Sequence, residues 1–373
     1  MKFMKQTILF ILLTLGLPGF GYGQTSNSTP PLNNPGAWLK SLQDIKDLKP
    51  FTDVQRCIAL MEYADAAKDN AFYFQARTDF FKALKRDIPN GLTRIEFILA
   101  VWPGMVRRNH FDGLKAAMTD IDVMMDKNKV GNYAWAYYNA ILAGFALALN
   151  DKESANMYLK AGGTYTRHLI DVPNAVAWKP INGDKVFDTL PGRSIDMNDS
   201  TYYYFCKIAI HLAQKGDTTN YTKFIANAKK RGNYRDSIAY TFAIADATLG
   251  EFDRARLHWK QYNAQSRNPW DSQFCLSFII RQEFLAGEFR SWDTKDQMLT
   301  QLSKEKDALA EDMGGSALPQ FYFDYGRGIA RHKTNQEITE EYNDLSSKLA
   351  KDELAFFMAG VATGLQDKKN PKR

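Results

Sequence analysis

The chain has 373 residues, of which 45% are hydrophobic and 24% are charged, and its formal net charge is +6. These proportions are those of a folded globular protein and exclude wholesale disorder, while the length favours two domains or an elongated stack over one compact core. The positive charges are scattered and form no clustered basic face of the kind that contacts a phosphate backbone, so we expect no nucleic-acid partner.

The first 23 residues have the pattern of a secretory signal peptide. Lys2 and Lys5 precede the apolar run ILFILLTLGLPGF, and Gly21-Tyr22-Gly23 supplies the small residues that signal peptidase accepts. The apolar run is too short for a membrane anchor. We therefore expect cleavage near Gly23, export of the mature chain to the periplasm or the exterior, and no integral membrane segment in the mature chain.

Residues 24–34 are rich in Ser, Thr, Asn and Pro, which is typical of a flexible leader, and residues 35–163 have the pattern of a first series of helical hairpins. The short turns of this series are expected at Asp69-Asn70, Asn109 and Asn150. Pro103 lies in the outgoing helix of the second pair, where it predicts a kink or an early end of that helix.

The hairpin pattern breaks over residues 164–199. The distance between successive turns nearly doubles across this stretch, and the stretch is rich in Pro and Gly, so we interpret it as an insertion. It carries His168 near its start and Trp178 near its middle. Long loops in compact proteins are often functional, and two roles stay open: a structural role, capping or separating the hairpins, and a ligand-binding role.

A second series of hairpins is expected over residues 200–366, with a basic tail over residues 367–373. Its turns are expected at Gly216, Gly250 and Gly287. The clearest member contains FAIADATLGEFDRARLHWKQY, in which small residues recur where two helices must approach and aromatic residues recur at helical spacing. These are Ala243, Ala245, Ala247 and Ala255, and Phe242, Phe252, Trp259 and Tyr262.

The segment LGEFDRARLHWKQY, with the alanines before it, resembles a tetratricopeptide repeat (TPR), in which a Gly ends the first helix, an aromatic residue opens the second and an Ala lets the two pack. The resemblance is fair over residues 60–89 and 142–162 and partial elsewhere. Paired helices repeating with a period in the mid-thirties are typical of an α-solenoid. The resemblance implies an all-α fold, a TPR-like α-α superhelix of about six hairpins with one long insertion.

In that family the first helix of each hairpin lines a concave face that holds peptides, and this implies a set of candidate ligand-binding residues. The matching positions here carry Tyr137, Tyr203, Tyr240, Phe274 and Arg281. Trp178 and His168 of the insertion join this set. A face this apolar is either buried within the protein, as aromatic stripes usually are, or covered by a partner. Burial is the favoured interpretation.

No pattern in the sequence indicates catalysis. The five histidines lie in distant segments without metal-ligand spacing, and the chain has no P-loop, no dinucleotide-binding glycine motif between a strand and a helix, and no GxSxG elbow. We therefore expect no metal and no cofactor and assign no catalytic residue. Cys57, Cys206 and Cys275 lie in apolar helical runs and are expected to be buried free thiols.

These observations favour an exported, non-catalytic TPR-like scaffold or binding protein that holds a protein or peptide partner. Two alternatives stay open, and a glycan would be the ligand in both. An all-α carbohydrate-active enzyme would need two carboxylates facing each other across an aromatic-lined cleft. A glycan-binding protein like the SusD family is the other alternative, against which the absence of a Cys after the expected cleavage site counts.

Overall fold

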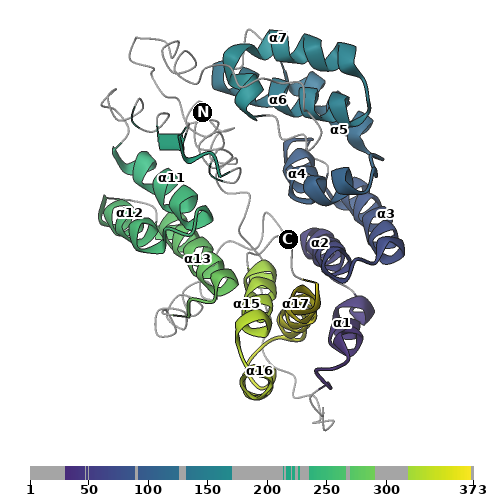
Figure 1. Ribbon diagram of the computed structural model, residues 1–373, viewed down its shortest axis with the longest axis vertical. Coiled ribbons are helices and arrows are strands. Elements are labelled where there is room, and N and C mark those ends of the chain that lie inside the picture. The colour runs from purple at the N-terminus through teal and green to yellow at the C-terminus, as the bar shows by residue number, and fades with distance from the viewer. Residues whose placement is uncertain are drawn as a thin grey trace. The chain divides into compact units, whose positions relative to one another are not determined.

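The computed structural model describes residues 30–46, 48, 50–88, 91–125, 132–169, 235–265, 269–289 and 318–370, with a few positions between 213 and 226. Within these ranges the regular structure consists of thirteen α-helices, with no strand (Figure 1). The prediction of an all-α fold is therefore confirmed. No helix in the described ranges combines the length and the apolarity needed to cross a membrane.

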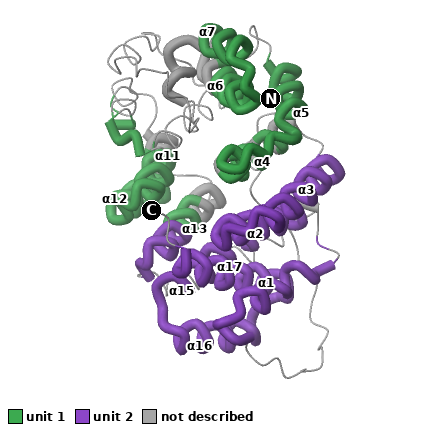
Figure 2. Tube along the Cα trace, turned by 45° about the vertical axis from the view of Figure 1, so that its right-hand side comes forward, with its two compact units in different colours: residues 1–8, 90–279 green, residues 9–89, 280–373 purple. Residues whose placement is uncertain are grey.

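The chain divides into two compact units (Figure 2). Apart from the first eight residues, unit 1 is the continuous segment Asn90–Ile279, and unit 2 combines Leu9–Pro89 with Ile280–Arg373. Unit 2 therefore brings together an early and a late part of the chain. The compact units are divided after Pro89 and after Ile279, and they do not test the predicted series of hairpins. The division of the hairpins into residues 35–163 and 200–366 therefore stays a prediction.

Unit 2 is built around its last helix. Its helices are α1 (Pro35–Asp44), α2 (Pro50–Ala67), α3 (Asn70–Asp87), α15 (Leu318–His332), α16 (Asn335–Ser346) and α17 (Lys351–Lys369). Helix α17 packs against α15, α1 and α2, and all its residues from Ala355 to Leu365 are buried. A helix that is buried on every side belongs to the interior of a domain. In a solenoid each repeat contacts only its neighbours, whereas α17 packs against α1 and α2, which come much earlier in the chain. For this reason the solenoid arrangement stays a prediction.

Helices α15 and α17 approach each other at glycines. A Cβ atom added at Gly360 would lie 2.0 Å from the carbonyl oxygen of Phe323, and one added at Gly326 would lie 2.2 Å from the carbonyl oxygen of Phe357. Only a residue without a side chain lets the two backbones come this close. The glycines thus fix the spacing of the two helices that form the centre of unit 2.

Unit 1 is made of helical hairpins. Its helices are α4 (Gly91–Arg107), α5 (Leu114–Met124), α6 (Asn132–Ala148), α7 (Lys152–Leu169), α11 (Arg235–Thr248) and α12 (Phe252–Gln265), while α13 (Pro269–Ala286) begins in unit 1 and ends in unit 2. The pairs α4 and α5, α6 and α7, and α11 and α12 pack together. In the last pair the predicted small residues Ala243, Ala247 and Ala255 are buried in one cluster, against which Trp259 packs.

The six predicted turns share one backbone conformation. At each, or directly before it at Asp69-Asn70, lies one residue in the left-handed region with φ between +56° and +86°: Lys68, Asn109, Asn150, Gly216, Gly250 and Gly287. At Gly250 the amide donates to the carbonyl of Ala247, and the next amide, that of Glu251, donates to the carbonyl of Asp246. This pair of bonds is the Schellman motif that ends many helices. The predicted positions of the turns are confirmed.

Three helix boundaries differ from the prediction. Helix α4 does not end at Pro103 but continues to Arg107, and α7 continues beyond the expected start of the insertion to Leu169. Helix α17 extends to Lys369, into the expected basic tail. In that tail Asp367 is held by ion pairs to Arg327 and Arg331, which explains why the helix does not end at Leu365. The insertion beyond Leu169 lies outside the described residues.

Candidate functional site

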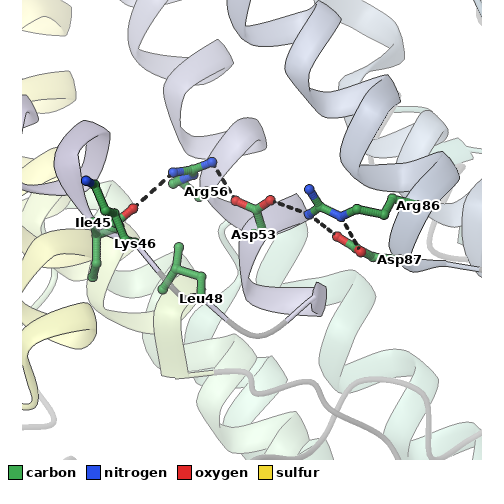
Figure 3. A pocket seen from close by; sticks show the side chains of 7 residues that line it. All are labelled: Ile45, Lys46, Leu48, Asp53, Arg56, Arg86 and Asp87. Atoms are coloured by element: carbon green, nitrogen blue, oxygen red, sulfur yellow. Dashed lines mark hydrogen bonds and ion pairs between the residues drawn. The ribbon is translucent and has the colours of Figure 1, made fainter.

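A pocket of about 550 Å³ lies in unit 2 where α1 ends, α2 begins and α3 ends (Figure 3). Seven residues line it: Ile45, Lys46, Leu48, Asp53, Arg56, Arg86 and Asp87. Five of these side chains are charged, and the volume is that of a small-molecule site. We treat this pocket as the candidate functional site because positioned charges line it.

A chain of ion pairs fixes the charged side chains of the pocket. Asp53 accepts from Nη2 of Arg56 at 2.6 Å on one carboxylate oxygen and from Nη2 of Arg86 at 2.8 Å on the other. Arg86 also binds Asp87, with Nε donating to Oδ1 at 2.6 Å and Nη2 to Oδ2. Nη1 of Arg56 donates to the carbonyl of Ile45 at 3.2 Å. The chain therefore links all three helices (Figure 3).

The hairpin topology explains why these residues meet. Asp53 lies in the first turn of α2 and Arg86 in the last turn of α3, and the two ends of a helical hairpin lie side by side. A carboxylate at a helix N-terminus and a guanidinium at a C-terminus also complement the helix dipoles. The helix dipoles therefore favour Asp53 and Arg86 at the positions where the two side chains form their ion pair.

The balance of charge in the pocket is positive. Three cations, on Lys46, Arg56 and Arg86, face two carboxylates, on Asp53 and Asp87. The hydrogen bonds that Arg86 makes to Asp87 and Asp53 raise the pKa of its guanidinium above its already high ordinary value. Its charge is therefore permanent at any physiological pH.

Cys57 follows Arg56 in the sequence but has no features of a nucleophile. It is free and 1% exposed. Burial, with a smaller contribution from the charge of Asp53, raises the pKa of the thiol to about 12. A thiol attacks only as the thiolate, so this side chain is inert at neutral pH. Cys275 is also buried, as predicted, while Cys206 lies outside the described residues.

The sequence-predicted ligand-binding residues do not line this pocket. Tyr240 on α11 is half-buried and packs against Tyr262 with ring centroids 5.3 Å apart. Arg281 on α13 donates from Nη2 to Asp324 on α15 at 2.6 Å, and its side chain is only 16% exposed. Both residues therefore contact side chains within their own unit.

The other predicted ligand-binding residues cannot be placed as side chains. Tyr137, Phe274 and His168 belong to α6, α13 and α7, and their side chains lie outside the described part of the structure. Tyr203 and Trp178 lie outside the described residues altogether. Their assignment as ligand-binding residues stays a prediction.

A second polar cluster lies in unit 1, around Asp246 on α11. This carboxylate is 1% exposed and accepts from Nε and Nη2 of Arg254, both at 2.8 Å, and from the hydroxyl of Tyr221 at 3.3 Å. Burial, together with the charge of Asp246, raises the pKa of Tyr221 above its ordinary value. His258 lies 3.6 Å from Asp246 and stacks on Phe242. The cluster joins α11 to α12 through the Asp246–Arg254 ion pair and the stacking of His258 on Phe242.

No group of three or more His, Cys, Asp or Glu side chains in the described ranges has the geometry to hold a metal ion. Comparison with known proteins finds no matching family model, no similar curated protein and no similar solved structure.

No sequence motif predicted the pocket. The signal that could have found it is the opposite charge at the two ends of one hairpin, Asp53 and Arg86.

Proposed function

We propose that the protein is an exported, non-catalytic scaffold or binding protein that holds a protein or peptide partner. The observation that carries the proposal is the pocket at the α1–α2–α3 corner, in which fixed charges line an open space beside Ile45 and Leu48. Positioned charges with apolar neighbours suit recognition. The described residues of the pocket include no His, Ser or Cys that could act as a nucleophile or its base.

The finer fold assignment belongs to this proposal. A TPR-like arrangement of about six hairpins is supported by two observations. The six turns each have one residue in the left-handed conformation, and alanines line the contact between α11 and α12. Proteins built from such hairpins commonly bind partners over extended surfaces. Export is supported by the sequence pattern of residues 1–23 alone.

The pocket offers less support for glycoside hydrolysis. That reaction needs one carboxyl group that donates a proton and a second that acts on the sugar, usually beside an aromatic platform. Both oxygens of Asp53 and both oxygens of Asp87 are engaged by arginines, and no aromatic residue lines the pocket. The proposal therefore gives the glycan alternatives second place.

The test uses the chain from Gln24 onward, immobilised and exposed to a cell-envelope extract of the source organism. The proposal expects one or more proteins to be retained by the wild type and to be lost or strongly reduced with Arg86→Gln. Lys82→Gln is the matched control, because Lys82 lies on the same helix and pairs with Asp79 but does not line the pocket. Turnover of a polysaccharide panel, or retention of no protein by the wild type, would refute the proposal.

A further inference from the structure

We draw no further inference here: the strongest candidate, the exposed apolar surface that Val123 on α5 and Met157 on α7 contribute to unit 1, carries nothing because nothing in the described part of the structure shows what covers these side chains.

Discussion

Single glycines set the packing of unit 2. At Gly360 and Gly326 the backbones of α15 and α17 are in contact, and α17 is buried on all sides around this crossing. Interiors this tightly packed tolerate added volume poorly, because neither helix can move without disturbing its other neighbours. The residue scale is therefore where the most sensitive stability predictions lie.

Gly360→Ala is expected to destabilise the protein by about 3 kcal/mol, because the new methyl group would lie 2.0 Å from the carbonyl oxygen of Phe323. Urea denaturation followed by circular dichroism measures the change. Gly144→Ala is the matched control: this helical glycine has only a side-chain atom of Trp102 at 3.9 Å, so the variant should be neutral or up to about 1 kcal/mol more stable. Equal destabilisation by both variants would contradict the close approach.

Cys57 is expected to resist alkylation in the folded protein at pH 8, because burial raises the pKa of its thiol to about 12. A Cys206→Ala background removes the thiol outside the described residues, and mass spectrometry counts the labels that iodoacetamide adds before and after unfolding. Rapid labelling of native Cys57 at pH 8 would contradict the burial.

The same raised pKa predicts a loss of stability in alkali. Below pH 9, the ordinary pKa of the thiol, Cys57 is neutral in both states and its contribution is constant. Between pH 9 and about 12 the unfolded chain ionises and the folded chain does not, so the free energy of unfolding falls by up to about 1.4 kcal/mol per pH unit. Cys57→Ala should flatten this part of the pH profile.

At the scale of elements, the hairpin turns show what the sequence could predict. Gly216, Gly250 and Gly287 were identifiable because glycine is the residue that tolerates a left-handed conformation. Asn109 and Asn150 were identifiable because asparagine is the next most tolerant. Lys68 carries φ of +57° although lysine has no such tolerance, and here only the neighbouring Asp69 and Asn70 indicated the turn.

Lys68→Gly is expected to stabilise the α2–α3 hairpin by about 0.5–1 kcal/mol, because glycine adopts the left-handed conformation without the steric cost of a Cβ. Thermal denaturation of three variants tests this. Lys68→Ala should be neutral, since both residues carry a Cβ, and Gly250→Ala should lose about 1 kcal/mol, since φ there is +80°. A destabilised Lys68→Gly variant would mean that the Lys68 side chain contributes a contact.

The candidate site was harder to predict than the helices. Asp53, Arg86 and Asp87 are common residue types on the surface of helices, and no short motif joins positions 53 and 86. Hairpin pairing could have brought Asp53 to Arg86, because α2 begins where α3 ends. It could not have placed Lys46 and Leu48, because the segment between α1 and α2 has no periodicity from which to infer a direction.

At the scale of the whole molecule, a buried ion-pair cluster joins the early and late segments of unit 2. Arg327 on α15 is 12% exposed and pairs with Glu62 on α2 at 2.6 Å and with Asp367 on α17 at 2.8 Å. Burial raises the pKa of Asp367, but hydrogen bonds from Arg327 and the charges of Arg327 and Arg331 outweigh it and hold this pKa below its usual value.

Arg327→Met is expected to cost about 3–5 kcal/mol, because it leaves Asp367 and Glu62 without the charge between them. Arg94→Met is the control: Arg94 pairs with Asp120 at 3.1 Å and is 28% exposed, so its loss should cost about 1 kcal/mol or less. Chemical denaturation measures both.

The pKa of Asp367 is lowered in the folded state, so Asp367 contributes to the free energy of unfolding above about pH 4, and this contribution is lost as the pH falls. Arg327→Met should reduce this acid sensitivity.

The central position of α17 has a consequence in time. Tyr63 and Gln366, which meet in the finished fold, are separated by 303 positions along the chain. A ribosome makes α1 and α2 early and α17 late, and domains generally fold during synthesis as their last element emerges. The middle segment, Asn90–Ile279, can therefore fold before α17 has been synthesised, while α1 and α2 do not yet have the helix against which they pack. The unit that is begun first is the one that is completed last.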